Sequence, residues 1–124
     1  MVSNRSFSDL FKGNRRSFGE FNPKNIKAQM QTHKREYAEG NFEAHFKGEL
    51  GIGVVPILDD GNCWWGAIDI DNHGSSEDLD LIGIEKKVKD LNLPLVSCRS
   101  KSGGAHLYMF SSEPLRADMV KGLL

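Results

Sequence analysis

Residues 64–71, with the sequence Trp-Trp-Gly-Ala-Ile-Asp-Ile-Asp, constrain the fold of this chain more than any other stretch. Small and β-branched residues separate the carboxylates, a pattern that predicts a buried β-strand ending in two acids. Because side chains alternate along a strand, Asp69 and Asp71 are expected on one face, with Ile68 and Ile70 on the other. Two carboxylates on one face repel each other unless a cation lies between them. The run therefore indicates either a divalent-cation site or a strand that ends in a solvated acidic turn.

A second run, residues 95–110, predicts two further strands at 95–99 and 105–110, joined by a loop at 100–104. If the strand at 105–110 lies antiparallel to the first strand, its beginning lies beside the acidic end of that strand. His106 and the loop would then lie next to the two carboxylates, on one face of the sheet. Carboxylates suited to a metal, a basic glycine-containing loop suited to phosphates and a histidine would thus converge at one place.

The loop at residues 100–104 is a candidate phosphate-binding loop, although a glycine-rich hairpin loop also occurs without any ligand. Gly103 and Gly104 let backbone N–H groups turn toward a ligand, and Lys101 and Arg99 add positive charge. The candidate nucleotide-binding residues are Arg99, Ser100, Lys101, Ser102, Gly103, Gly104 and His106.

The same residues carry a resemblance to a known family. Ala-Ile-Asp-Ile-Asp at 67–71, followed by Arg-Ser-Lys-Ser-Gly-Gly-Ala-His-Leu-Tyr at 99–108, resembles the archaeo-eukaryotic primase superfamily of nucleotidyltransferases. The spelling is most similar to the primase-polymerase domains of bacterial TOTE conflict systems. The resemblance spans roughly residues 42–114 and rests on two motifs that occur in order around one expected helix.

The resemblance implies a role for each motif. The superfamily's hydrophobic-Asp-hydrophobic-Asp motif binds catalytic divalent metals, and it falls here on Asp69 and Asp71. The small-x-His motif contacts the phosphates of the incoming nucleotide, and its histidine is His106. Many members have serine where this chain has Gly104, so a hydroxyl contact would have to come from elsewhere, for instance Ser102.

The implied activity is that of a DNA/RNA primase-polymerase, a template-directed nucleotidyltransferase. It would use an NTP or dNTP with two Mg²⁺ or Mn²⁺ ions held by Asp69 and Asp71, and DNA as template and primer. His106 would act with these aspartates as a catalytic residue. The family's third metal-binding aspartate has no counterpart before Leu124. The chain is therefore expected to be the N-terminal part of a catalytic domain, inactive alone, with fused helicase or nuclease domains expected after Leu124.

Two other functions stay open at this point. The polymerase module of an end-joining repair ligase shares these motifs, although the surrounding sequence fits the conflict-system group better. A non-catalytic nucleotide- or nucleic-acid-binding module is the alternative from another class, because the chain supplies only two of the three expected carboxylates.

Charge does not mark the whole chain as a nucleic-acid binder, since 16 Lys and Arg are offset by 17 Asp and Glu. Residues 1–36 are locally basic, with eight Lys and Arg against three acids. Such a segment either contacts a phosphate backbone or forms a solvated surface.

Cysteine content and hydropathy indicate the cellular compartment and redox state to expect. Cys63 and Cys98 are too few for a structural zinc site or a disulfide framework. They are expected to be reduced, unpaired and toward opposite ends of the sheet. No apolar run approaches the roughly 20 residues that span a bilayer, so a cytoplasmic protein without membrane contact is expected.

The predicted fold class is mixed α/β (α+β), with a small helical N-terminal module in residues 1–50. An RRM-like core in residues 51–124 would follow in the order βαββα, with antiparallel central strands and its last strand missing. Helices are predicted at 6–12, 22–40, 42–50, 75–91 and 114–124, a loop at 13–21, a hairpin of strands at 52–58 and 63–70, and strands at 95–99 and 105–110. The helices are expected to cover one sheet face and to leave the Asp69–His106 face open.

Three side-chain environments follow from this pattern. His33 lies on the apolar stripe of the helix at 22–40 and is expected to be packed rather than to bind a ligand. Trp65 shares the carboxylate face, where it either stacks on a base or packs across strands. The helix at 75–91 is expected to bury Leu81, Ile84, Val88 and Leu91.

Overall fold

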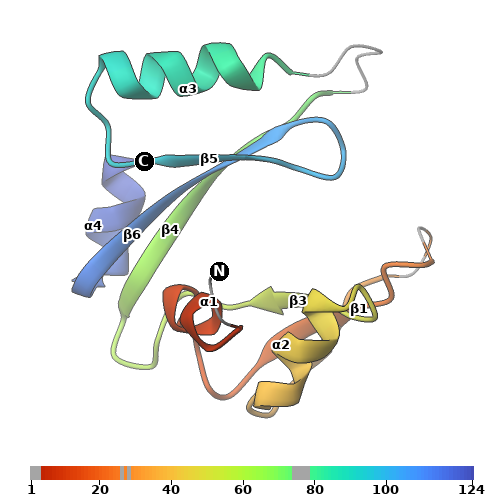
Figure 1. The fold of residues 1–124 in the computed structure, drawn as a ribbon. Helices are drawn as coiled ribbons and strands as arrows, with labels where there is room; N and C mark the ends of the chain where they lie inside the picture. The colour runs from red at the N-terminus through yellow and green to blue at the C-terminus, as the bar shows by residue number, and fades with distance from the viewer. Residues whose placement is uncertain (1–3, 26, 28, 74–78) are drawn as a thin grey trace.

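The computed structural model describes residues 4–25, 27, 29–73 and 79–124. In this part of the chain the fold is mixed α/β, with four helices and two three-stranded antiparallel sheets (Figure 1). The elements in order are α1 (Asn4–Leu10), β1 (Phe18–Phe21), β2 (Gln31–His33), α2 (Glu39–Phe46), β3 (Gly51–Val54), β4 (Asn62–Ile70), α3 (Leu81–Asp90), β5 (Val96–Arg99), β6 (Ala105–Arg116) and α4 (Ala117–Leu123).

The larger sheet has the strand order β4-β6-β5 and carries both sequence motifs. β6 is antiparallel to β4 and to β5, so β4 and β5 run parallel to each other. Cys63 pairs with Leu115 and Cys98 with His106, nearly the whole of β6 apart, and both cysteines are free. The predicted antiparallel neighbours and the separated, unpaired cysteines are thus confirmed.

β6 is longer than the predicted strand because it continues past an irregularity. Cys63 pairs with Leu115 but Trp65 pairs with Phe110, so β6 carries extra residues opposite Trp64. Pro114, which has no N–H to donate, lies in this irregular stretch, where a missing ladder hydrogen bond costs little. The helix predicted at 114–124 therefore begins only at Ala117.

The hydrophobic core lies between this sheet and α4. Cys63, Met109 and Val120 are buried together, and half-buried side chains pack around them. α4 crosses the sheet behind β4 and β6, whereas α3 runs beside β5 at the sheet edge (Figure 1).

α3 packs less deeply than its apolar stripe predicts. No residue of α3 is fully buried, and Leu91, which follows it, is 68% exposed. The helix begins at Leu81 because the carboxylate of Asp80 accepts a hydrogen bond from the N–H of Gly83 and caps it. The predicted start at Ser75 or Ser76 lies outside the described residues.

The smaller sheet corrects the prediction of a helical N-terminal module. β1 lies within the predicted loop at 13–21, and β2 lies within the predicted helix at 22–40. The side chains of Asn22 and Asn25 each accept a hydrogen bond from the N–H two residues later, which closes turns instead of a helix. Backbone pairing of β2 with β1 then outweighs the helical spacing of the apolar residues.

His33 ends up packed, as expected, but on a strand. Its ring stacks on Phe18 with centroids 5.1 Å apart, and Phe18 is fully buried. α2 begins at Glu39, before the predicted start at 42, since the side-chain oxygen of Asn41 accepts the N–H of Ala38.

The predicted hairpin of strands at 52–58 and 63–70 is also wrong, although its turn forms. The N–H of Leu58 donates to the carbonyl of Asn62 at 2.8 Å, and Gly61 has a φ of 80° that glycine adopts readily. β3, however, pairs with β1 in the smaller sheet. The turn therefore connects the smaller sheet to the larger sheet. The smaller sheet contains strands from both sides of position 50, the predicted boundary between the N-terminal module and the core.

Aromatic side chains join α1 to the larger sheet. Phe11, which follows α1, meets the rings of Trp65, Tyr108 and Phe110 edge-to-face at centroid distances of 5.1, 5.3 and 5.2 Å. The indole N–H of Trp65 also donates to the carbonyl of Lys12. The face that carries Asp69 is therefore covered along the part where Trp65 lies, and Trp65 packs across strands rather than standing open. Within the described residues, no helix is both long and apolar enough to cross a membrane.

Candidate metal and nucleotide site

Asp69 and His106 are direct partners in the β4–β6 register. The imidazole Nε2 of His106 lies 3.4 Å from the Oδ1 of Asp69, and the two side chains are 40% and 72% exposed. Strand alternation predicted this contact, and the structure confirms that both side chains lie on one face of neighbouring antiparallel strands. The pair is open to solvent, so a ligand can reach it.

Tyr108 holds the other side of the imidazole, a contact that the sequence analysis missed. Its hydroxyl lies 3.1 Å from Nδ1 of His106. Burial raises the pKa of Tyr108, and negative charge at Cys98 and Asp69 raises it further, so the hydroxyl keeps its proton near neutral pH. The signal was present in the sequence, since residues two apart on a strand share a face.

These two contacts favour one tautomer of the neutral imidazole. A carboxylate accepts hydrogen bonds and donates none, so the carboxylate of Asp69, 3.4 Å from Nε2, favours a hydrogen on that nitrogen. Nδ1 then accepts, and the hydroxyl of Tyr108 donates. His106 therefore presents an N–H on the carboxylate face of the sheet.

Asp71 lies one residue past the end of β4 and is exposed. It precedes Asn72 and His73, and His73 has a positive φ of 45° that marks a turn. The strand alternation that places Asp69 beside His106 therefore stops just before Asp71. The predicted placement of Asp71 on the same face as Asp69 therefore stays a prediction.

The loop after β5 is held by its own hydrogen bonds. The N–H groups of Gly103 and Gly104 donate to the carbonyl and the hydroxyl of Ser100, and the hydroxyls of Ser100 and Ser102 lie 3.1 Å apart. Gly103 has a φ of 85°, which allows this tight turn. The predicted aiming of both glycine amides at a ligand is thus wrong, because the loop itself uses them.

The two cations beside the loop make contacts of their own. The guanidinium of Arg99 donates to the carbonyl of Leu79 at 3.1 Å, which ties the segment before α3 to the loop. The ammonium of Lys101 lies 5.0 Å from the ring centroid of Phe21 in β1. Lys101 remains exposed and can swing toward an anion, whereas Arg99 has a structural contact.

Comparison with protein families identifies the family of this chain. The model of the archaeo-eukaryotic primase domain of TOTE conflict systems matches residues 6–124. The chain belongs to this primase family. A comparison with curated proteins finds none that matches. The family lies in a superfamily of primase-polymerase-like nucleotidyltransferases, and the match covers both motifs as well as most of the N-terminal region.

The packing around Gly104 leaves no room for a side chain. Gly104 is buried, and a Cβ at this position would overlap the carbonyl oxygen of Ile70 at the end of β4. In this primase domain the loop therefore lies directly against the strand that carries Asp69. Any hydroxyl toward a nucleotide has to come from another position, and Ser102 is exposed.

The donor set of the primase site suits a hard cation only in part. Asp69 and Asp71 offer carboxylate oxygens, the ligands that Mg²⁺ and Mn²⁺ prefer. Among the residues that the structure describes, no cluster of three or more His, Cys, Asp or Glu side chains could hold a metal ion. Two carboxylates fit an ion that keeps several water or phosphate ligands, as Mg²⁺ does in phosphoryl-transfer sites.

Proposed function

We propose that this primase domain carries out template-directed nucleotidyl transfer. The 3′-hydroxyl of a primer or an initiating nucleotide would attack the α-phosphate of an NTP or dNTP. A new phosphodiester bond would form, the bond between the α-phosphate and the β-phosphate oxygen would break, and pyrophosphate would leave. The observation that carries the proposal is the register pairing of Asp69 with His106, solvent-open and beside the loop at 100–104.

The two carboxylates would hold the catalytic ions. Asp69 and Asp71 lie at the end of β4, where both are exposed. Bound Mg²⁺ or Mn²⁺ supplies positive charge that lowers the pKa of the attacking hydroxyl and neutralises the triphosphate. The chain would present the carboxylate of Asp69 from the end of β4 and that of Asp71 from the residue that follows the strand.

His106 and Lys101 would bind the β- and γ-phosphates. His106 offers a ring N–H supported by the contact with Tyr108, and Lys101 offers an exposed ammonium. Ser102 adds a hydroxyl from the loop. The loop's internal hydrogen bonds support this role, because they fix the backbone on which Lys101 and Ser102 are presented.

The arrangement of the larger sheet supports the further proposal of an RRM-like catalytic core. The order β4–α3–β5–β6–α4 and the strand order β4-β6-β5 match the beginning of a β-α-β-β-α-β unit. In such a unit the carboxylates and the histidine occupy adjacent central strands, where the sheet holds them at a fixed spacing.

The test is nucleotide incorporation on a primed template by the protein that carries this domain. Asp69→Asn should lower incorporation by about 100-fold or more, because an amide is a weak ligand for hard cations and about 3 kcal/mol of stabilisation is lost. Asp59→Asn is the matched control, since Asp59 lies in the turn before β4 and pairs with Arg16 at 3.1 Å. Incorporation by Asp69→Asn at the wild-type rate would overturn the proposal.

A second function, a non-catalytic nucleotide- or nucleic-acid-binding module, is favoured by one observation. The described residues provide two carboxylates at the site rather than a cluster of three ligands. Wild-type protein that binds nucleotide or template but incorporates nothing would select this second function.

A further inference from the structure

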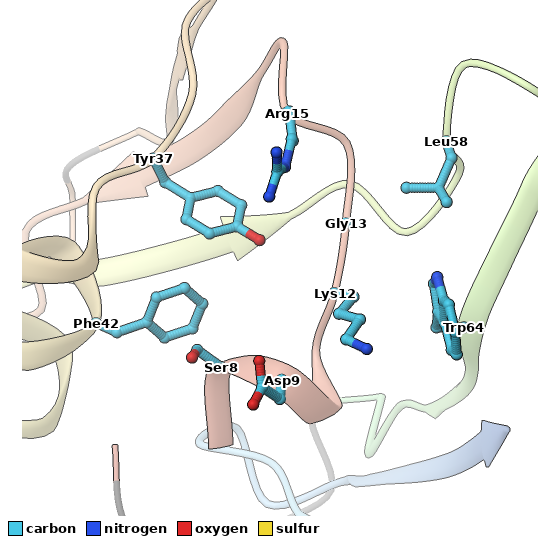
Figure 2. A pocket seen from close by; sticks show the side chains of 9 residues that line it. All are labelled: Ser8, Asp9, Lys12, Gly13, Arg15, Tyr37, Phe42, Leu58 and Trp64. Atoms are coloured by element: carbon cyan, nitrogen blue, oxygen red, sulfur yellow. The ribbon is translucent and has the colours of Figure 1, made fainter. Parts of the chain in front are cut away.

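A pocket of about 630 Å³ lies where the N-terminal part of the chain meets the beginning of β4 (Figure 2). α1 and the chain that follows it form one wall, Tyr37 and Phe42 form a second, and Leu58 and Trp64 form the third. Trp64 and Asp69 are five positions apart on β4, about 17 Å at roughly 3.3 Å per residue. The pocket is therefore separate from the metal and nucleotide site.

Two cations and an aromatic ring face this pocket. The ammonium of Lys12 lies 4.2 Å from the ring centroid of Trp64, and Figure 2 shows Lys12 pointing toward that ring. Arg15 lines the pocket on the opposite side of Gly13 from Lys12, and its Nε lies 3.3 Å from a carboxylate oxygen of Glu36. Asp9 contributes one carboxylate to the lining, while Glu36 lies outside it, so the lining residues themselves comprise two cations and one carboxylate.

The opposite wall is rigid and carries a neutral hydroxyl. Tyr37 meets Phe18 and Phe42 edge-to-face, with centroids 6.2 and 5.2 Å apart, so its ring is fixed. Figure 2 shows its hydroxyl directed into the space between Arg15 and Ser8. Burial raises the pKa of Tyr37, so this hydroxyl stays protonated and can donate to a ligand.

An aromatic ring beside two cations matches the chemistry of a single nucleotide within a strand. Base stacking on tryptophan is sequence-tolerant, and lysine and arginine bind the flanking phosphates. The pocket volume falls in the range that holds a ligand of nucleotide size. A base that stacks on Trp64 would displace the ammonium of Lys12 from the ring toward a phosphate.

We propose that this pocket, the Trp64 pocket, binds one nucleotide of a single-stranded nucleic acid, with the base on Trp64 and the backbone phosphates at Lys12 and Arg15. The inference deepens the proposed function, on which it rests, by giving the template strand a contact outside the metal and nucleotide site. It also gives the basic N-terminal segment a specific contact.

The experiment measures binding of a fluorescently labelled 12-nucleotide oligothymidylate by anisotropy, with EDTA and without nucleoside triphosphate. Trp64→Leu should weaken binding by about 5- to 100-fold, the range expected for losing one base stack. Lys12→Gln should weaken binding and reduce the slope of log affinity against log salt by about 0.7. Lys24→Gln is the matched control, because Lys24 lies on the same basic segment but outside the pocket. It should leave both the affinity and the salt slope close to the wild-type values.

Lys12 is exposed, so Lys12→Gln tests the proposal even if Trp64→Leu fails to fold. Equal losses in Lys12→Gln and Lys24→Gln, or no loss in Lys12→Gln, would overturn it. Thymidine monophosphate competing as strongly as the oligonucleotide would identify a free nucleotide as the occupant and would also overturn it. The binding assay contains neither divalent metal nor nucleoside triphosphate, so a failure of catalysis and a failure of the Trp64 pocket give different results.

Discussion

The hydroxyl of Tyr108 lies 3.1 Å from Nδ1 of His106, where it supports the tautomer with the hydrogen on Nε2. Tyr108→Phe removes the donor to Nδ1, so the neutral imidazole should lose its preference for hydrogen on Nε2. The imidazole ¹⁵N chemical shifts report the tautomer directly. Tyr37→Phe is the matched control, because Tyr37 lies in the Trp64 pocket and should leave the His106 shifts unchanged. Unchanged His106 shifts in Tyr108→Phe would contradict this role.

Gly104 is required by the close approach of the loop to the carbonyl of Ile70. Gly104→Ala should lower the free energy of unfolding by about 1–3 kcal/mol, because the added methyl group forces the loop away from β4. Urea denaturation measures the change. Gly122→Ala is the control, since nothing lies within 4 Å of a Cβ there, and alanine in α4 should be neutral or stabilising. Equal effects of both substitutions would argue against a steric role for Gly104.

Among the elements, α1 and the larger sheet meet through Phe11, which packs the N-terminal part of the chain against three aromatic rings. Phe11→Ala removes three edge-to-face ring contacts and should lower the free energy of unfolding by about 2–4 kcal/mol. Leu10→Ala, one residue away on α1 and 46% exposed in the wild type, should cost less than about 1 kcal/mol. Urea midpoints of the two variants decide the question, and similar midpoints would contradict the role given to Phe11.

The sequence predicted correctly those strands in which the alternation of side chains matches the way the strand packs in the sheet. β4 and β6 alternate side chains strictly near Asp69 and His106, so period and register agree. The helix predicted at 22–40 failed because its apolar spacing fits a helix locally, whereas pairing of β2 with β1 is a tertiary event. The hairpin failed likewise, since the turn at Asn62 forms under either strand pairing.

At the scale of the whole molecule, contacts between distant segments complete the candidate site. Lys101 reaches the ring of Phe21 in the smaller sheet, and Arg99 holds the segment before α3. The motif spelling identified both cations as candidates, but these long-range partners carry no local pattern and could not be predicted. The Trp64 pocket was unpredictable for the same reason, because three separate parts of the chain form its walls.

The Asp69–His106 end of the sheet is proposed to bind a metal ion and a triphosphate together. The decisive measurement is calorimetric titration of a nucleoside triphosphate, with and without Mn²⁺. Asp69→Asn should abolish the metal-dependent part of binding, and His106→Ala should weaken triphosphate binding by about 1–3 kcal/mol with metal binding nearly intact. Appreciable triphosphate affinity is expected for the wild type only when Mn²⁺ is present. Equal affinity of the wild type with and without Mn²⁺ would rule out joint binding of metal and triphosphate at this site.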